Sequence, residues 1–350
     1  MKKLKKPHLR NIYDKATCLK QLAAENFPRV TLSFYRYVKI QHPKELRDQL
    51  FREWSALGVL GRIYLAREGI NAQLSVPEHH LQAFKKNLDS HLEFAEMYLN
   101  IGLEQSESFY KLTLKVKKQI VADGLPEGSF DLSNVGNHLT PEEFNEALDK
   151  EETVVVDMRN FYESKIGRFE KALCPDSNTF KEELPLVLDA LKGQEDKKVI
   201  MYCTGGIRCE KASAYLKHHG FKDVNQLRGG IITYMQHVRQ KNLPVRFHGQ
   251  NYVFDERIAE RATNEILSNC DQCETPWDSY VNCKNAACNL LFLQCPSCAE
   301  TWNGSCSLDC KAVYDLPLEE RRAHYAKQKK SDYTVYVSRI RPHLKGSAKA

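Results

Sequence analysis

The chain has 350 residues, 12 cysteines and a formal net charge of +6. This length exceeds a single compact core and favours two or three domains. No apolar run reaches 18 residues and the basic first residues lack the apolar core of a signal peptide, so we expect a cytoplasmic protein without a membrane partner.

The first 120 residues carry the hydrophobic patterns of a small sheet covered by helices. Their order predicts a ferredoxin-like α+β domain over residues 1–120. Six segments have the periodicity of strands or helices, in the order strand, helix, strand, strand, helix, strand: 30–40, 43–57, 62–66, 70–76, 77–88 and 111–117.

On the last of these strands, apolar residues alternate with Lys111, Lys115 and Lys117. A sheet with one open face turns polar residues to water, and this is one interpretation. The other is a track for RNA phosphates. Basic residues at both ends of the chain favour a polyanion: residues 311–350 hold ten Lys/Arg against four Asp/Glu, a balance of +6. Solvated tails would explain the same charges.

Residues 121–138 are rich in Gly, Asp, Ser and Asn and predict a linker. From residue 139 to 245, short apolar strands alternate with helices, and Thr140 with Glu143 forms a helix-starting capping box. This alternation predicts a parallel α/β domain. Beyond it we predict three segments: a connector at 246–269, a cysteine-rich module at 270–312 and a basic tail at 313–350.

Cys203 is the candidate reactive residue. It ends the apolar strand VIMYC, and a helix is predicted from residue 207. Open α/β sheets build their sites at this end of their strands. The amides of the glycine-containing loop, the helix N-terminus and Arg208 all favour thiolate over thiol. We therefore assign catalysis to Cys203 and Arg208 and the loop to the residues between them: Thr204, Gly205, Gly206 and Ile207.

The loop is a Cys-x4-Arg segment, one residue shorter than the Cys-x5-Arg cradle of phosphatases. It resembles the rhodanese family, whose loop holds a persulfide on the cysteine. The segments 167–173 and 227–231 also resemble rhodanese stretches. We expect Asp157, Arg159 and Glu163 to support the loop through hydrogen bonds. Cys209 follows the loop directly and is either a resolving thiol or a packed residue.

The resemblance extends beyond a simple rhodanese domain, over residues 28–312. The motifs that carry it are FYRY at 34–37, GRIY at 61–64, EGINA at 68–72, CTGGIRCEKA at 203–212 and FDER at 254–257. Together they resemble a rhodanese-containing subfamily, the tRNA uridine(34) hydroxylases. This resemblance implies oxygen-dependent 5-hydroxylation of the wobble uridine by an oxidoreductase that binds tRNA. Sulfur transfer and a non-catalytic zinc or RNA-binding role are the alternatives.

No Gly-x-Gly-x-x-Gly loop and no flavin signature occurs in the sequence, so no cofactor beyond zinc is recognised and molecular oxygen enters as a substrate. His91 and Glu93 form a lone His-x-Glu pair, which we interpret as ordinary surface residues rather than an iron site.

Eight cysteines between residues 270 and 310 form four close pairs. Two cysteines at such spacing bind one metal ion from a single turn, so four pairs predict two closed, structural zinc sites. Sequential and interleaved pairing both fit the spacing. The pairs are Cys270 with Cys273, Cys283 with Cys288, Cys295 with Cys298, and Cys306 with Cys310.

Overall fold

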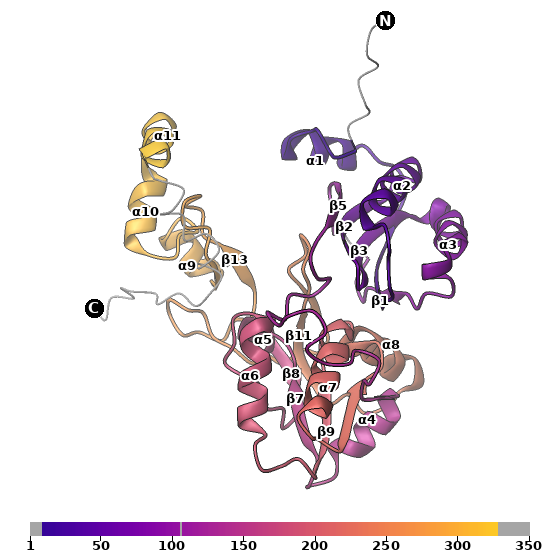
Figure 1. Cartoon of the computed structure of the whole chain (residues 1–350). Coiled ribbons are helices and arrows are strands. Elements are labelled where there is room, and N and C mark those ends of the chain that lie inside the picture. The colour runs from indigo at the N-terminus through magenta and orange to yellow at the C-terminus, as the bar shows by residue number, and fades with distance from the viewer. Residues whose placement is uncertain (1–8, 106, 328–350) are drawn as a thin grey trace, which may run out of the picture.

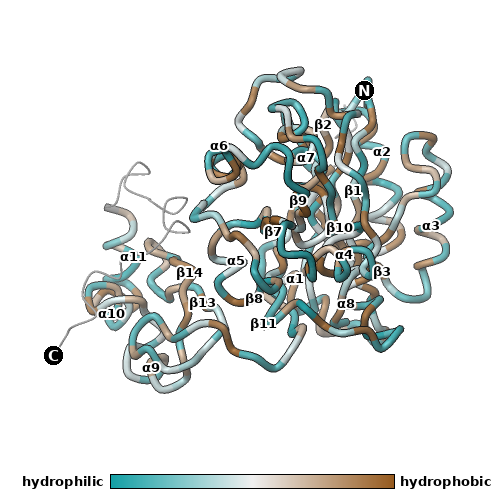
Figure 2. The backbone as a smooth tube through the Cα atoms, turned by 90° about the horizontal axis from the view of Figure 1, so that it is seen from below, coloured by the Kyte–Doolittle hydropathy of each residue, from teal (hydrophilic) through white to brown (hydrophobic). Residues whose placement is uncertain are grey.

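The computed structural model describes residues 9–105 and 107–327. Figure 1 shows an N-terminal domain, a central α/β domain and a C-terminal module set apart from the N-terminal domain. Figure 2, seen from below, again shows this module to one side of the two larger domains. The predicted multidomain α/β architecture is confirmed. Residues 1–8 and 328–350, which include most of the predicted basic ends, lie outside the described residues.

The N-terminal domain is a five-stranded sheet in the order β4-β1-β3-β2-β5. The ferredoxin-like prediction is confirmed, with one difference. The predicted last strand, β5, pairs in parallel with β2 at one edge, while the two-residue β4 occupies the opposite edge beside β1. So short a strand has no periodicity from which to predict it. The elements are α1 (Lys15–Ala23), β1 (Arg29–Tyr37), α2 (Pro43–Ala56), β2 (Leu60–Ala66), β3 (Gly69–Pro77), α3 (Leu81–Ser90), β4 (Asn100–Ile101) and β5 (Leu112–Val116).

Side chains alternate between the two faces of this sheet. One face packs under α2 and α3 around fully buried residues such as Trp54, Ile63 and Phe84. The other face carries the intervening polar and aromatic side chains of β1, β2 and β3, and it points towards the central domain. The N-terminal domain therefore has a polar wall available for a site.

The central domain has a parallel sheet in the order β6-β10-β9-β7. Alternate residues of β9 enter two separate cores: Ile200 packs with α4 and α8, and Met201 with α6 and α7. Both faces of the sheet are covered, as its apolar strands predict. The elements are β6 (Asn137–Leu139), α4 (Pro141–Leu148), β7 (Val154–Asp157), α5 (Phe161–Ile166), α6 (Phe180–Ala190), β9 (Lys198–Tyr202), α7 (Ile207–His218), β10 (Asp223–Leu227) and α8 (Gly230–Lys241).

Two small sheets complete the fold. One has the order β12-β11-β8, so the segment predicted as a connector contributes two strands that join the central domain. The other is a hairpin in the cysteine-rich module. The elements are β8 (Gly167–Phe169), β11 (Phe247–Tyr252), β12 (Ala259–Arg261), β13 (Tyr280–Asn282), β14 (Leu291–Leu293), α9 (Pro296–Thr301), α10 (Leu308–Asp315) and α11 (Leu318–Lys327).

No helix of the described chain is long and apolar enough to cross a membrane.

Candidate active site

Cys203 lies directly after β9, where the sequence places it, and its side chain is buried. The chain turns sharply around the sulfur before α7 begins. Gly206 adopts a left-handed φ of 101° and its N–H donates to Cys203 Sγ at 3.1 Å. A Cβ at Gly206 would lie 2.7 Å from the Tyr35 hydroxyl, so glycine is required both for this turn and for this contact.

Arg208 closes the loop through Glu163 of α5. Its Nη1 and Nη2 donate to the two carboxylate oxygens of Glu163 at 2.6 Å and 2.9 Å, and Glu163 is fully buried. Thr204 Oγ1 lies 3.4 Å from the same carboxylate. Such a bidentate pair fixes the guanidinium plane and keeps both buried charges compensated.

The environment of Cys203 stabilises its thiolate. Burial acts against the charge, but hydrogen bonds from the Cys209 thiol and the Arg208 and Cys209 amides, with the Arg208 charge, lower the pKa of Cys203 to about 6. Burial and the bond to Cys203 raise the pKa of Cys209 instead. At neutral pH Cys203 is therefore mainly a thiolate, and Cys209 is a neutral donor beside it.

Asp157 and Arg159 act one step further from the sulfur. Arg159 donates to both oxygens of Asp157 at 2.8 Å and 2.7 Å and to the Gly167 carbonyl at 2.6 Å. Asp157 also accepts from the hydroxyl of Tyr202 at 2.7 Å. This buried network holds the residue before Cys203, whereas Glu163 holds the loop itself.

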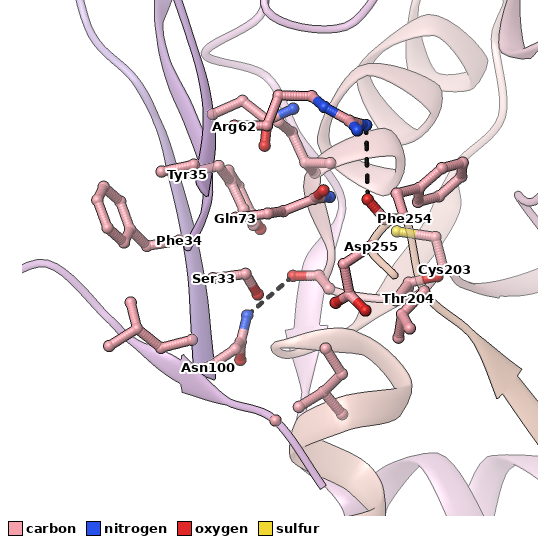
Figure 3. A pocket seen from close by; sticks show the side chains of 18 of the residues that line it. Ser33, Phe34, Tyr35, Arg62, Gln73, Asn100, Cys203, Thr204, Phe254 and Asp255 are labelled. Carbon is pink, nitrogen blue, oxygen red and sulfur yellow. Dashed lines mark hydrogen bonds between the residues drawn. The ribbon is translucent and has the colours of Figure 1, made fainter. Parts of the chain in front are cut away.

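A cavity of about 340 Å³ opens between the Cys203 loop and the polar face of the N-terminal sheet. Figure 3 shows Arg62 and Gln73 on the sheet side, with Cys203 and Thr204 on the other side. Phe254 and its neighbours after β11 close a further side. The volume suits a small molecule or a single nucleobase.

Contacts from α7 hold the two walls together. Glu210 accepts from the Tyr35 hydroxyl at 2.9 Å, and the buried Lys211 pairs with Asp123 at 2.7 Å and Glu68 at 3.0 Å. Tyr35, Glu68 and Lys211 lie within three of the family motifs, but the motifs alone give these residues no role. The available signal was a polar or charged residue in each of three motifs that lie far apart along the chain.

The eight cysteines of the module form two groups in which all sulfur atoms lie within 4.8 Å of one another. Pairing is interleaved, which decides between the two arrangements that the spacing leaves open. Neighbouring sulfurs lie at 3.6 Å in each group, close to the edge of about 3.8 Å in a tetrahedron of sulfurs around zinc. The groups are Cys270, Cys273, Cys295 and Cys298, and Cys283, Cys288, Cys306 and Cys310.

Lys115 of β5 and the flanking Lys111 and Lys117 are exposed, and the Lys117 ammonium lies 5.3 Å from the centre of the Tyr64 ring. Tyr64 and Lys115 are register partners, so the lysine edge continues the polar wall of the cavity. His91 is buried and its Nε2 lies 2.9 Å from Glu53, which gives it a structural contact.

Comparison with known proteins assigns this arrangement to a family. A tRNA uridine(34) hydroxylase of Leptospira interrogans is 54% identical over 97% of this chain and 93% of its own. Those of Escherichia fergusonii and Salmonella arizonae are 48% and 47% identical, over 90% and 93% of this chain and 91% and 93% of theirs. The chain belongs to the tRNA uridine(34) hydroxylase family.

Three domain families match along the chain, and they follow its parts. Residues 29–120 match the UPF0176 acylphosphatase like domain, residues 140–237 the rhodanese-like domain, and residues 248–311 the rhodanase C-terminal family. In this chain the rhodanese-like domain and the UPF0176 acylphosphatase like domain thus supply opposite walls of one cavity.

Proposed function

We propose that the protein is a cytoplasmic oxidoreductase that hydroxylates the wobble uridine of tRNA at C5, with molecular oxygen as the oxidant. The name shared by its relatives supports the reaction. The observation that carries a chemical role is a thiol with a pKa of about 6 at an interdomain cavity of nucleobase size. Enzymes that modify a base extrude it into such a pocket.

In this proposal Cys203 is the catalytic residue, because its sulfur lines the cavity. Arg208 stabilises the thiolate and is held by Glu163. The backbone of residues 204–207 shapes the cradle, and Cys209 donates to the sulfur. Asp157 and Arg159 position the strand that ends at Cys203.

Gene deletion followed by mass spectrometry of tRNA digests tests the function. We expect loss of 5-hydroxyuridine derivatives, restored by the intact gene and not by a Cys203→Ala version. The purified protein should form the product with oxygen present and none under nitrogen. Unchanged nucleosides after deletion would contradict the proposal.

Sulfur transfer is the second candidate, and the loop geometry favours it. The Gly206 N–H at 3.1 Å from Cys203 Sγ is suited to hold a persulfide as well as a thiolate. Loss of thiolated nucleosides after gene deletion would support sulfur transfer instead. So would a rate of thiosulfate turnover that is the same with and without oxygen.

We propose that each four-cysteine group holds one structural zinc ion. The all-sulfur ligand sets and their spacing support a tetrahedral, closed site. Metal analysis of protein purified without added zinc should give two zinc ions per chain. Free thiols or disulfides with a ratio well below two would contradict this assignment.

We also propose that Lys115 of β5 and the flanking Lys111 and Lys117 contact RNA phosphates, because they extend the cavity wall to the edge of the sheet. Replacing Lys111, Lys115 and Lys117 by Ala should weaken tRNA binding and lower the slope of log affinity against log salt by about three. Removal of residues 315–350 tests the basic tail in the same assay. An unchanged slope of log affinity against log salt would show that the altered residues do not contact RNA phosphates.

A further inference from the structure

The wall of the cavity opposite Cys203 presents two neighbouring side chains from the N-terminal sheet. Arg62 on β2 and Gln73 on β3 are direct cross-strand partners. Their side chains share one face, because residues at paired positions of a ladder point the same way. Figure 3 shows both reaching into the space in front of Cys203.

Most other polar groups of the cavity already have partners within the protein. Tyr35 donates to Glu210 at 2.9 Å and Asn71 to the Ile120 carbonyl at 3.2 Å. Asn100 accepts from Thr233 at 2.7 Å and donates to the Gly205 carbonyl at 3.3 Å. These residues build the wall and keep little capacity for a ligand.

The charged groups of the cavity are also largely compensated. Arg208 is paired with Glu163 at 2.6 Å, and Arg257 with Glu260 at 2.6 Å. Arg62 differs from both. Its guanidinium reaches only the Phe254 carbonyl at 3.5 Å, the outer limit of a hydrogen bond, and no described carboxylate lies within ion-pair distance.

Gln73 is uncommitted in the same way. Within residues 9–105 and 107–327 its amide has no hydrogen-bond partner, although it lies at the cavity. The Gln73 amide offers an acceptor oxygen beside an NH2 donor, and the neighbouring Arg62 guanidinium offers donors alone. The amide oxygen of Gln73 can therefore lie between two donors, its own NH2 group and the guanidinium of Arg62.

That pattern is the complement of the Watson–Crick edge of uracil, which presents the N3–H donor between two carbonyl acceptors. We propose that Gln73 and Arg62 recognise this edge of the target uridine, and that they determine specificity for uridine. The inference rests on the proposed hydroxylase function and names how its substrate base is selected.

The position of the pair also orients the base for reaction. In a pyrimidine ring C6 lies opposite N3, and C5 is bonded to C6. A uracil whose Watson–Crick edge meets the sheet wall therefore turns C6 towards the Cys203 wall, with C5 beside it. Tyr64 and Phe254, which also line the cavity, offer rings for stacking against an extruded base.

Cytosine fits the same pair less well. It presents an amino group where uracil has O4, and a guanidinium has no acceptor for an amino group. The Gln73 amide alone could rotate to suit either base. Arg62 beside it makes the uracil orientation the favoured one.

Binding of two anticodon stem-loop RNAs tests the inference without relying on turnover. The RNAs differ only in uridine or cytidine at the wobble position, and fluorescence anisotropy is measured with oxygen excluded. We expect wild type to bind the uridine RNA about tenfold more tightly. Gln73→Ala should weaken uridine binding roughly tenfold and bring the two affinities together.

Gln73→Glu keeps the size of the side chain and replaces its donors by acceptors. It should shift preference towards cytidine, whose amino group donates to a carboxylate. A purely structural role for Gln73 would not move this ratio. The matched control is Thr113→Ala, next to Arg62 in the β2–β5 register and outside the cavity lining, which should keep the wild-type ratio.

Arg62→Gln separates a base contact from a phosphate contact. Loss of the uridine preference supports the base contact. Equal weakening of both RNAs, with a salt slope lower by about one, would assign Arg62 to a phosphate and overturn its role in base selection. Gln73 variants with an unchanged ratio, or wild type that binds both RNAs equally, would overturn the inference as a whole.

Failure of the proposed function looks different. If Gln73 variants change the ratio of the affinities for the uridine and cytidine RNAs, but the protein forms no 5-hydroxyuridine, the recognition role of Gln73 and Arg62 stands and the hydroxylase function is rejected. If the protein hydroxylates tRNA and those variants leave the affinity ratio unchanged, the hydroxylase function stands and the recognition role is rejected.

Discussion

Cysteine lies in two different environments in two regions of this molecule. In the loop after β9, one sulfur is surrounded by N–H donors and a guanidinium, and its pKa falls to about 6. In the C-terminal module each sulfur is surrounded by three others within 4.8 Å. A thiolate stabilised by the protein remains free to react, whereas four thiolates that ligate one metal ion form a closed site and are not free to react. The environment, rather than the residue type, decides the role.

Helix α5 lies between these two regions and contacts both. Its Glu163 holds Arg208 of the loop, while Lys165 pairs with Asp271 of the module at 2.6 Å. The Tyr162 carbonyl accepts from the Tyr280 hydroxyl at 2.9 Å, and Ile166 packs in the same apolar cluster as Tyr280. The module therefore supports the helix whose Glu163 orients Arg208.

Of the changes that test this comparison between the Cys203 loop and the cysteine-rich module, metal removal should have the largest effect. Structural zinc contributes on the order of 10 kcal/mol to the folding of a small module, since few other contacts stabilise it. A chelator should release two zinc ions and expose residues 270–312 to proteolysis, measured by mass spectrometry of the fragments. A module that stays protease-resistant after complete metal loss would contradict a metal-dependent fold.

Cys203→Ser should have the next largest effect, and on activity rather than folding. We expect a loss of catalytic rate on the order of 10³-fold or more, because a hydroxyl at this position is a far weaker nucleophile. The thermal midpoint should fall by only a few degrees. Cys174→Ser, outside the loop and both metal groups, is the matched control with full activity. An active Cys203→Ser protein would make Cys203 structural.

The pH dependence of alkylation should distinguish Cys203 from an ordinary thiol. Only the thiolate reacts, and it is lost as pH falls below a pKa of about 6. The Cys203 rate with iodoacetamide should therefore rise about tenfold between pH 5 and 7 and then level off. Burial raises the pKa of Cys174 to about 12, so its rate should still be rising at pH 9. Peptide mass spectrometry measures both rates, and parallel profiles would contradict the prediction.

Lys165→Met should have the smallest effect. The ion pair with Asp271 is partly exposed, with 33% of the Lys165 side chain accessible to solvent. We therefore expect the free energy of unfolding to fall by less than about 1 kcal/mol. The Cys203 alkylation rate should not change. A large loss in a denaturant titration would show that the module depends on this ion pair as well as on its metal.

Local sequence predicted the features that short segments encode. Cys203, its glycine loop and Arg208 lie within six consecutive residues, so the strand-loop-helix geometry was predictable from them alone. The close spacing within each cysteine pair likewise predicted metal binding. The position of β5 was predicted only in part, because periodicity gives a strand its faces and not its neighbours in the sheet.

Tertiary structure decided which distant segments meet. Interleaving Cys270 and Cys273 with Cys295 and Cys298 depends on the β13–β14 hairpin, which brings the first pair to the third. Glu163 lies 45 residues before Arg208, and its role follows from the packing of α5 against the loop.

The sequence by itself therefore determined the family, the candidate reactive cysteine and the candidate metal ligands, since each depends on local motifs. Only the fold determined the cavity. Its second wall comes from Arg62 and Gln73, more than a hundred residues before Cys203, on a sheet whose alternation gives one face to a core and the other to the site. Periodicity shows that such a polar face exists, but long-range packing, here through Lys211 and Glu210, decides what it faces.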